Sequence, residues 1–218
     1  MQISALLLFL GIVALAAHQV WRTRLGLVAQ TEQQMSRLDM VFAEQTGRAV
    51  QTVDLVLHGI TEDARAGRMP GPGGANAYDA TLARRIAMIV QAIGVGVVDA
   101  AGRLVFVSDP KLAHLVFPAE VSAAIDRVIA HPDSNLEISV PFRLPQGDWT
   151  ALMIRPVLPS DGIVKFAAIA FLKLNYFADF YRAVELSEDG AILLHRRDGV
   201  VLSRFPPDSA LIGKSYAD

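Results

Sequence analysis

An apolar stretch from Ile3 to Trp21 opens the chain and constrains what the rest of it can be. Only three polar residues interrupt it: Ser4, His18 and Gln19. A helix of this length can cross about 30 Å of hydrocarbon, with Trp21 at the lipid–water interface. We therefore predict a transmembrane anchor over residues 1–22, followed by a globular domain.

A cleaved signal peptide is the other interpretation of this stretch, because Ala14–Ala16 has the small-x-small pattern that signal peptidases accept. The anchor is favoured because no Lys or Arg precedes the apolar run and a helix-compatible polar stretch follows it without a break. Arg22 and Arg24 would place the next domain in the cytoplasm by the positive-inside rule. Long domains translocate largely regardless of such charges. We therefore expect one span in the inner membrane and the domain in the periplasm.

Composition and motifs exclude several function classes. The chain has 218 residues, with Lys+Arg 20 against Asp+Glu 22, so it has no basic excess for binding nucleic acid. The absence of cysteine excludes disulfides, thiolate catalysis and Cys-ligated metals. The five histidines show no metal-binding spacing, and no P-loop, GxGxxG, GxSxG or kinase motif occurs. We expect no metal, no cofactor and no enzyme activity, so any catalytic domain would lie beyond residue 218.

A long amphipathic helix is predicted over residues 23–67, where no proline occurs between Thr23 and Ala66. Apolar or small residues recur there at helical spacing: Thr46, Ala49, Val50, Val53, Leu57, Ile60 and Ala64. Its amino-terminal half is more polar, so that half either projects as a solvated stalk or pairs with a second subunit. A Pro/Gly-rich loop at residues 68–74 and a shorter helix at residues 78–90 follow.

The next hundred residues predict an antiparallel sheet flanked by helices, and hence an α+β fold. Apolar runs, alternation and turn residues indicate strands at 93–98, 104–107, 136–144, 149–158 and 163–173, with helices at 119–130 and 174–184. Strand 136–144 shows the clearest alternation, with Leu136, Ile138, Val140, Phe142 and Leu144 expected on one buried face.

A weak internal repeat relates two predicted hairpins. Placing Gly102 over Gly199 matches Val97–Pro110 with Leu194–Pro207, and each segment reads as two strands around a glycine turn with a proline after the second. Chance and a true duplication both account for the match. If the duplication is real, residues 188–218 are the first hairpin of an incomplete second module.

This order of elements resembles the double Cache family, the tandem PAS-like extracytoplasmic sensors of bacterial receptors. The resemblance rests on the amino-terminal span, the long helix and five segments: Gly96–Gly102, Trp149–Val157, Asp161–Gly162, Leu174–Phe177 and Asp198–Arg204. It implies a membrane-distal, ligand-holding lobe at residues 78–184, the start of a membrane-proximal lobe at 188–218, and an output domain outside this chain.

The resemblance also implies a function. We expect the ligand-sensing region of a histidine kinase, diguanylate cyclase or chemoreceptor, present as a homodimer and binding a small molecule such as a carboxylate or amino acid. The amino-acid-binding motif of the family does not map onto this sequence, so the ligand class stays open. An anchored or secreted periplasmic dimerisation domain without a ligand is the alternative.

Arg155 is the centre of the predicted binding site. Period-two geometry places it on one strand face with Trp149 and Met153, where it could hold a carboxylate beside an aromatic wall. Asp99 and Tyr176 are weaker candidates for the same site. The alternative is a strand-end arginine in solvent, because the adjacent Pro156 suggests an edge strand.

Overall fold

The computed structural model describes residues 40–66, 68, 86, 89–131, 136–157, 166–182 and 190–216. The predicted anchor at residues 1–22, residues 23–39 of the predicted long helix, the 68–74 loop except Arg68, and most of the 78–90 helix lie outside these residues. In the part of the chain that is described, no helix is long and apolar enough to span a membrane. The chain divides into two compact units, Met1–Arg48 and Ala49–Asp218, and the description below concerns the second.

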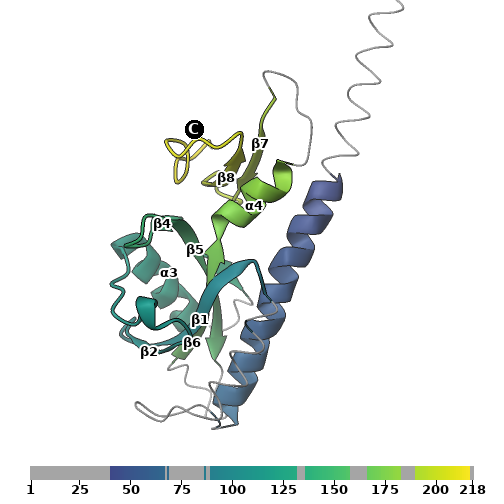
Figure 1. Cartoon of the computed structure of the whole chain (residues 1–218). Helices are drawn as coiled ribbons and strands as arrows, with labels where there is room; N and C mark the ends of the chain where they lie inside the picture. Colours follow the sequence, from purple (N-terminus) through teal and green to yellow (C-terminus); the bar gives the residue numbers. More distant parts are fainter. Residues whose placement is uncertain are drawn as a thin grey trace, which may run out of the picture. The chain divides into compact units, whose positions relative to one another are not determined.

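An antiparallel sheet of six strands forms the centre of this unit (Figure 1). Its strands are β1 (Ala92–Asp99), β2 (Leu104–Val107), β3 (Glu137–Ile138), β4 (Phe142–Arg143), β5 (Trp149–Val157) and β6 (Phe166–Lys173). The spatial order is β2-β1-β6-β5-β3, and β4 also pairs with β5. The predicted α+β class, the first hairpin and the antiparallel meander are therefore confirmed.

Apolar helix faces cover both sides of the sheet. Residues 40–65 are helical, and Val53, Leu57 and Ile60 are fully buried in one core cluster with Met153 of β5. Helix α3 (Ala119–Ala130) buries its apolar stripe in a second cluster on the opposite face. Burying a side chain of this size contributes about 1.5–3 kcal/mol. The apolar stripes that the sequence predicts on the two helices therefore stabilise their packing on the two faces of the sheet.

Strand 136–144 differs from its prediction because a β-bulge divides it into β3 and β4. Ile138 pairs with Met153 and Phe142 with Thr150, so four steps on one strand (142 − 138) oppose three on the other (153 − 150). One inserted residue reverses the alternation of side chains. Leu136 and Ile138 therefore pack on the long-helix face, whereas Val140, Phe142 and Leu144 pack on the α3 face. The predicted single buried face is wrong.

Ser139 fixes this bulge. Its side chain is fully buried, and its hydroxyl donates to the carbonyl of Val140 at 2.8 Å and accepts from the N–H of Leu152 at 2.9 Å. The backbone N–H of Ser139 donates to the carbonyl of Leu152 at 2.8 Å. The hydroxyl thus takes the place of a carbonyl where the ladder is interrupted, which keeps a buried N–H satisfied.

Helix α4 (Leu174–Tyr181) follows β6 directly and leads to a second sheet, formed by β7 (Ile192–His195) and β8 (Val201–Phe205). Phe177 and Tyr181 are buried, so these two aromatic side chains belong to the packed interior. The hydroxyl of Ser203 on β8 donates to the carbonyl of Leu174 at 3.2 Å. The hairpin is therefore joined to the helix by both packing and a buried hydrogen bond.

The β7–β8 hairpin repeats the backbone geometry of β1–β2. In each, the strand register shifts by one residue before the turn, after Val97 in the first and after Leu194 in the second. Gly102 and Gly199 have φ values of 71° and 79°. Each glycine N–H donates to the carbonyl three residues earlier, at 2.9 and 3.1 Å. The internal match in the sequence therefore corresponds to a repeated structure, turn and bulge included.

Candidate ligand-binding cleft

Three of the predicted site residues share one face of β5, as the strand periodicity requires. Met153 is fully buried in the core cluster under the long helix, and Trp149 packs partly against the same cluster. Arg155 follows on this face, toward the end of the strand. Met153 is therefore a core residue, with no access to solvent in this structure.

Arg155 already has a carboxylate partner within the chain. Its Nε and Nη2 donate to Asp54 Oδ1 at 2.9 and 2.7 Å, and Nη2 also donates to Oδ2 at 2.8 Å. The two side chains are 20% and 26% exposed, so the arginine is not solvated at a strand end, and that alternative is wrong. Charge-assisted bonds of this kind are among the stronger side-chain interactions. The pair joins the long helix to β5.

Asp99 and Tyr176 lie toward opposite ends of β5: Asp99 at the Arg155 end, and Tyr176, on the helix that follows β6, at the Trp149 end. Asp99 pairs with Phe166, which pairs with Val157 at the end of β5, whereas Trp149 begins that strand. β5 has nine residues, so at about 3.4 Å per residue its ends lie roughly 27 Å apart. Tyr176 lies on α4, where its hydroxyl accepts a 3.4 Å hydrogen bond from Gln91 Nε2.

The Asp99 carboxylate serves its own turn. It accepts from the backbone N–H groups of Ala101 and Arg103 at 2.9 and 3.0 Å and from Arg103 Nε at 2.9 Å. Burial raises the pKa of Asp99, but these hydrogen bonds outweigh burial and hold the pKa below its ordinary value. A carboxylate satisfied in this way is a turn-stabilising group.

A cleft of about 350 Å³ lies instead on the α3 side of the molecule. It is lined by Lys111, His114, Leu115, Val116, Arg143, Leu144 and Pro145. Every titratable side chain in this lining is basic, and the remaining residues are apolar. This combination of basic side chains and an apolar wall suits a small organic anion.

Two rigid turns form the walls of this cleft. The first is the 3-10 helix η1 (Pro110–Leu112), which is capped by the Asp109 side chain accepting from the N–H of Lys111 at 3.0 Å. Leu112 is fully buried and anchors the turn. The second is the β4–β5 turn, where Gly147, with φ of 97°, donates to the carbonyl of Leu144 at 2.8 Å. The lining residues are thus held by local backbone hydrogen bonds.

Arg143 connects the cleft to one of the predicted residues. Its guanidinium carbon lies 4.8 Å from the centre of the Trp149 ring, a cation–π arrangement. Arg143 pairs with Trp149 across β4 and β5. Among the described residues, the indole N–H of Trp149 is buried and has no hydrogen-bond partner.

The sequence indicates only part of this cleft. Trp149 was predicted from strand periodicity, whereas Arg143 is one of three polar residues, with Glu137 and Ser139, in the segment 136–144 and does not stand out. Nothing in the sequence joins Lys111 and His114 to Arg143, because the two segments meet only when the sheet forms. Within the described residues, no group of three or more His, Asp or Glu side chains could hold a metal ion.

Comparisons with known proteins agree on the fold. No protein-family model matches the sequence, and no curated protein does. The extracellular domain of the histidine kinase rpHK1S-Z16 is 25% identical, covers 86% of this chain and 75% of that chain, and gives a TM-score of 0.68. The ligand-binding domain of the Pseudomonas aeruginosa PAO1 amino-acid chemoreceptor PctC, in complex with GABA, is 17% identical over 86% and 80% of the chains, with a TM-score of 0.57.

A second chemoreceptor gives the same result. The ligand-binding domain of Pseudomonas fluorescens CtaA, in complex with L-isoleucine, is 17% identical over 80% of this chain and 68% of that chain, with a TM-score of 0.56. The fold is thus that of the extracellular ligand-binding domains of histidine kinases and chemoreceptors, the Cache type of sensor domain. The resemblance read from the sequence is confirmed.

Proposed function

We propose that this chain is the extracytoplasmic sensing region of a bacterial transmembrane receptor, which binds a small molecule and passes the signal across the inner membrane. The observation that carries the proposal is the match to the histidine kinase extracellular domain over 86% of this chain. Chemoreceptor domains of the same fold hold GABA and L-isoleucine, both of which are small amino acids. The catalytic or signalling output belongs to another part of such a receptor.

The cleft beside η1 is the proposed ligand site, and a small carboxylate is the proposed ligand class. Lys111 supplies a positive charge, His114 supplies a ring that can donate a hydrogen bond, and Leu115 and Val116 supply apolar contact. Arg143, which also lines the cleft, supplies a second positive charge and stacks on the ring of Trp149.

Thermal unfolding against a panel of amino acids and mono- and dicarboxylates, each at about 10 mM, tests this function. A ligand at 100 times its Kd stabilises the folded state by about 2.7 kcal/mol, which raises Tm by roughly 5–10 °C for a domain of this size. The variant Lys111→Gln should weaken binding about tenfold or more, because one charge-assisted hydrogen bond is lost. Lys214→Gln, an exposed lysine outside the cleft lining, is the matched control.

Two results would count against the proposal. If no compound in the panel raises Tm, a dimerisation domain without a ligand becomes the better interpretation. If a compound raises Tm equally in wild type and Lys111→Gln, the ligand binds elsewhere. Reporter fusions after residue 184 test the periplasmic location separately, because a periplasmic reporter should be active and a cytoplasmic one inactive.

A further inference from the structure

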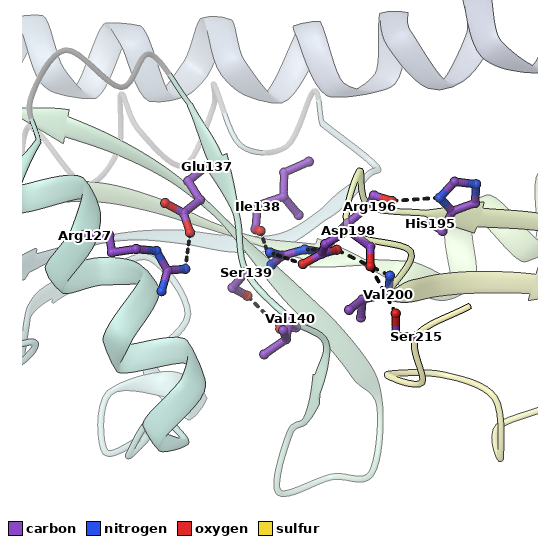
Figure 2. A network of polar contacts seen from close by, with 10 residues as sticks. All are labelled: Arg127, Glu137, Ile138, Ser139, Val140, His195, Arg196, Asp198, Val200 and Ser215. Carbon is purple, nitrogen blue, oxygen red and sulfur yellow. Dashed lines mark hydrogen bonds and ion pairs between the residues drawn. The ribbon is translucent and has the colours of Figure 1, made fainter. Parts of the chain in front are cut away.

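Strand β3 lies between two polar contacts that come from different parts of the fold (Figure 2). On one side, Arg127 of α3 forms an ion pair with Glu137. On the other side, Arg196 Nη1, in the turn after β7, donates to the backbone carbonyl of Ile138 at 2.6 Å. One residue of β3, Glu137, is thus bound by α3, and its neighbour Ile138 is bound by the second hairpin.

The backbone explains why the Ile138 carbonyl is available. Because Ser139 N–H donates to Leu152 across the strands, Ile138 occupies the non-hydrogen-bonded position, and its carbonyl points away from β5. β3 is the outermost strand on that side in the described part of the sheet. Arg196 therefore covers a carbonyl on an open sheet edge. An unpaired carbonyl there could pair with a strand of another chain.

Arg196 is held in place for this contact. Its Nε and Nη2 donate to the two carboxylate oxygens of Asp198 at 3.1 and 2.9 Å, which leaves Nη1 directed at Ile138. The Arg196 side chain is only 18% exposed. The backbone carbonyl of Asp198 accepts from the Ser215 hydroxyl at 3.1 Å, so the turn that carries the arginine is braced from its other end.

The repeated hairpin shows that the turn itself does not require this arginine. At the equivalent position of the first hairpin stands Asp99, whose side chain bonds to Ala101 and Arg103 of its own turn. In the second hairpin the same backbone position carries Arg196, which reaches another sheet. Arg196 thus keeps hydrogen bonds within its own turn, to Asp198, and adds a contact with another sheet.

β3 is also one of the two shortest strands of the sheet, so its displacement breaks few hydrogen bonds. It contains two residues, a bulge follows it at Ser139, and it lies at the sheet edge. Short edge strands next to bulges have few ladder bonds to break, and segments that move in signalling come from such low-stability regions. In contrast, β5 is paired with β6 from Thr150 to Val157.

We propose that β3 is a coupling strand, which transmits displacements of α3 to the β7–β8 hairpin through the Arg127–Glu137 and Arg196–Ile138 contacts. The link deepens the proposed sensing function and rests on it, because the cleft is lined by the segment just before α3 and by the turn just after β4. A ligand there would act on both flanks of β3. In energetic terms, breaking either contact on β3 should change the free energy of the other contact, and this change is the coupling free energy.

Hydrogen exchange on the unliganded 218-residue chain tests the coupling without any ligand. Arg127→Ala should speed amide exchange in β7 and β8 about fivefold, the factor for a coupling of about 1 kcal/mol. Arg196→Ala should do the same for the amides of α3. In the double variant, the increase in exchange rate in each region should be smaller than the product of the increases that the two single variants cause there, because both substitutions break the same link. The amides of β6 report global unfolding and provide the reference rate.

Arg103→Ala is the matched control, since Arg103 pairs with Asp99 in the equivalent turn of the first hairpin and should change neither region. Unchanged β7 and β8 exchange in Arg127→Ala, or single effects that simply multiply, would overturn the coupling. If Arg196→Ala unfolds the hairpin, Glu137→Gln and Arg127→Ala still decide the question from the α3 side. Because no ligand is used, failure here leaves the thermal-shift test of the sensing function intact.

Discussion

Removing the Arg155 side chain should destabilise the domain far more than removing a surface arginine of the same kind. Arg155 and Asp54 are 20% and 26% exposed, and their closest atoms are 2.7 Å apart. Breaking a fully buried pair costs about 3–5 kcal/mol, whereas an exposed pair is worth about 0–1 kcal/mol. For a pair about three-quarters buried, we expect Arg155→Ala to cost about 2–3 kcal/mol, between those limits.

Urea unfolding measures this cost. With a slope of about 2 kcal/mol per M, the midpoint should fall by about 1 M. Arg182→Ala is the control, because the Arg182–Asp179 pair has the same 2.7 Å separation but side chains that are 67% and 60% exposed. Its midpoint should fall by less than about 0.3 M, since such a pair contributes below about 0.5 kcal/mol.

Two further variants separate the explanations. Replacing both members of the pair with Asp54→Leu and Arg155→Met should restore much of the stability, because no uncompensated charge is left in the helix–sheet interface. If Arg155→Ala shifts the midpoint no more than Arg182→Ala, the pair does not hold the helix to β5. Asp54→Ala also tests Arg155 as a ligand contact: a carboxylate bound there would bind more tightly once Asp54 is gone.

Three other predictions follow from the backbone and its polar groups. Gly96→Ala should cost about 1–3 kcal/mol, because its Cβ would lie 2.7 Å from a β2 carbonyl oxygen, whereas Gly47→Ala, with open space around it, should stabilise by about 0.5–1 kcal/mol; urea midpoints measure both. Ser139→Ala should cost about 1–3 kcal/mol by the same assay, because it leaves a buried N–H unpaired. For Asp198, burial raises the pKa, but hydrogen bonds from Arg196 and the backbone outweigh it and lower the pKa. The contribution of Asp198 to the free energy of unfolding should therefore be present above its unfolded pKa of about 3.9 and be lost as the pH falls below that value. Urea midpoints should stay level from pH 5 to 8, and below pH 4 they should drop more in wild type than in Asp198→Asn.

Periodicity predicts the parts of this fold whose side chains see a uniform environment. The helix residues Val53, Leu57 and Ile60 are buried as their spacing indicates, and the long central strands lie within a few residues of their predicted bounds. The bulge at Ser139 could not be predicted in this way. Apolar residues occupy every second position from Leu136 to Leu144, and polar residues lie between them everywhere except at Pro141. The inserted residue itself shows only in the register against β5.

The surroundings of the predicted site residues could not be predicted for a related reason. Strand periodicity correctly places Trp149, Met153 and Arg155 on one face, but it does not reveal what covers that face. The long helix covers it, and Asp54, 101 positions earlier in the chain, pairs with the arginine. A long-range partner of this kind leaves no local pattern, and neither does the meeting of Lys111 with Arg143 in the cleft.

The two contacts on β3 and the clamp at Arg155 together suggest the direction in which a signal would travel. Met153 and Ile154 pair with β3, and the next residue of β5 is clamped to the long helix through Asp54. Moving β5 would break its full ladder with β6, whereas moving β3 breaks only a short one. A displacement at α3 should thus reach the second hairpin before it reaches the long helix. We therefore expect Asp54→Asn to leave hydrogen exchange in β7 and β8 within about twofold of wild type, relative to β6, although it lowers overall stability. A β7–β8 response to Asp54→Asn as large as the response to Arg127→Ala would mean that the whole sheet moves with the long helix.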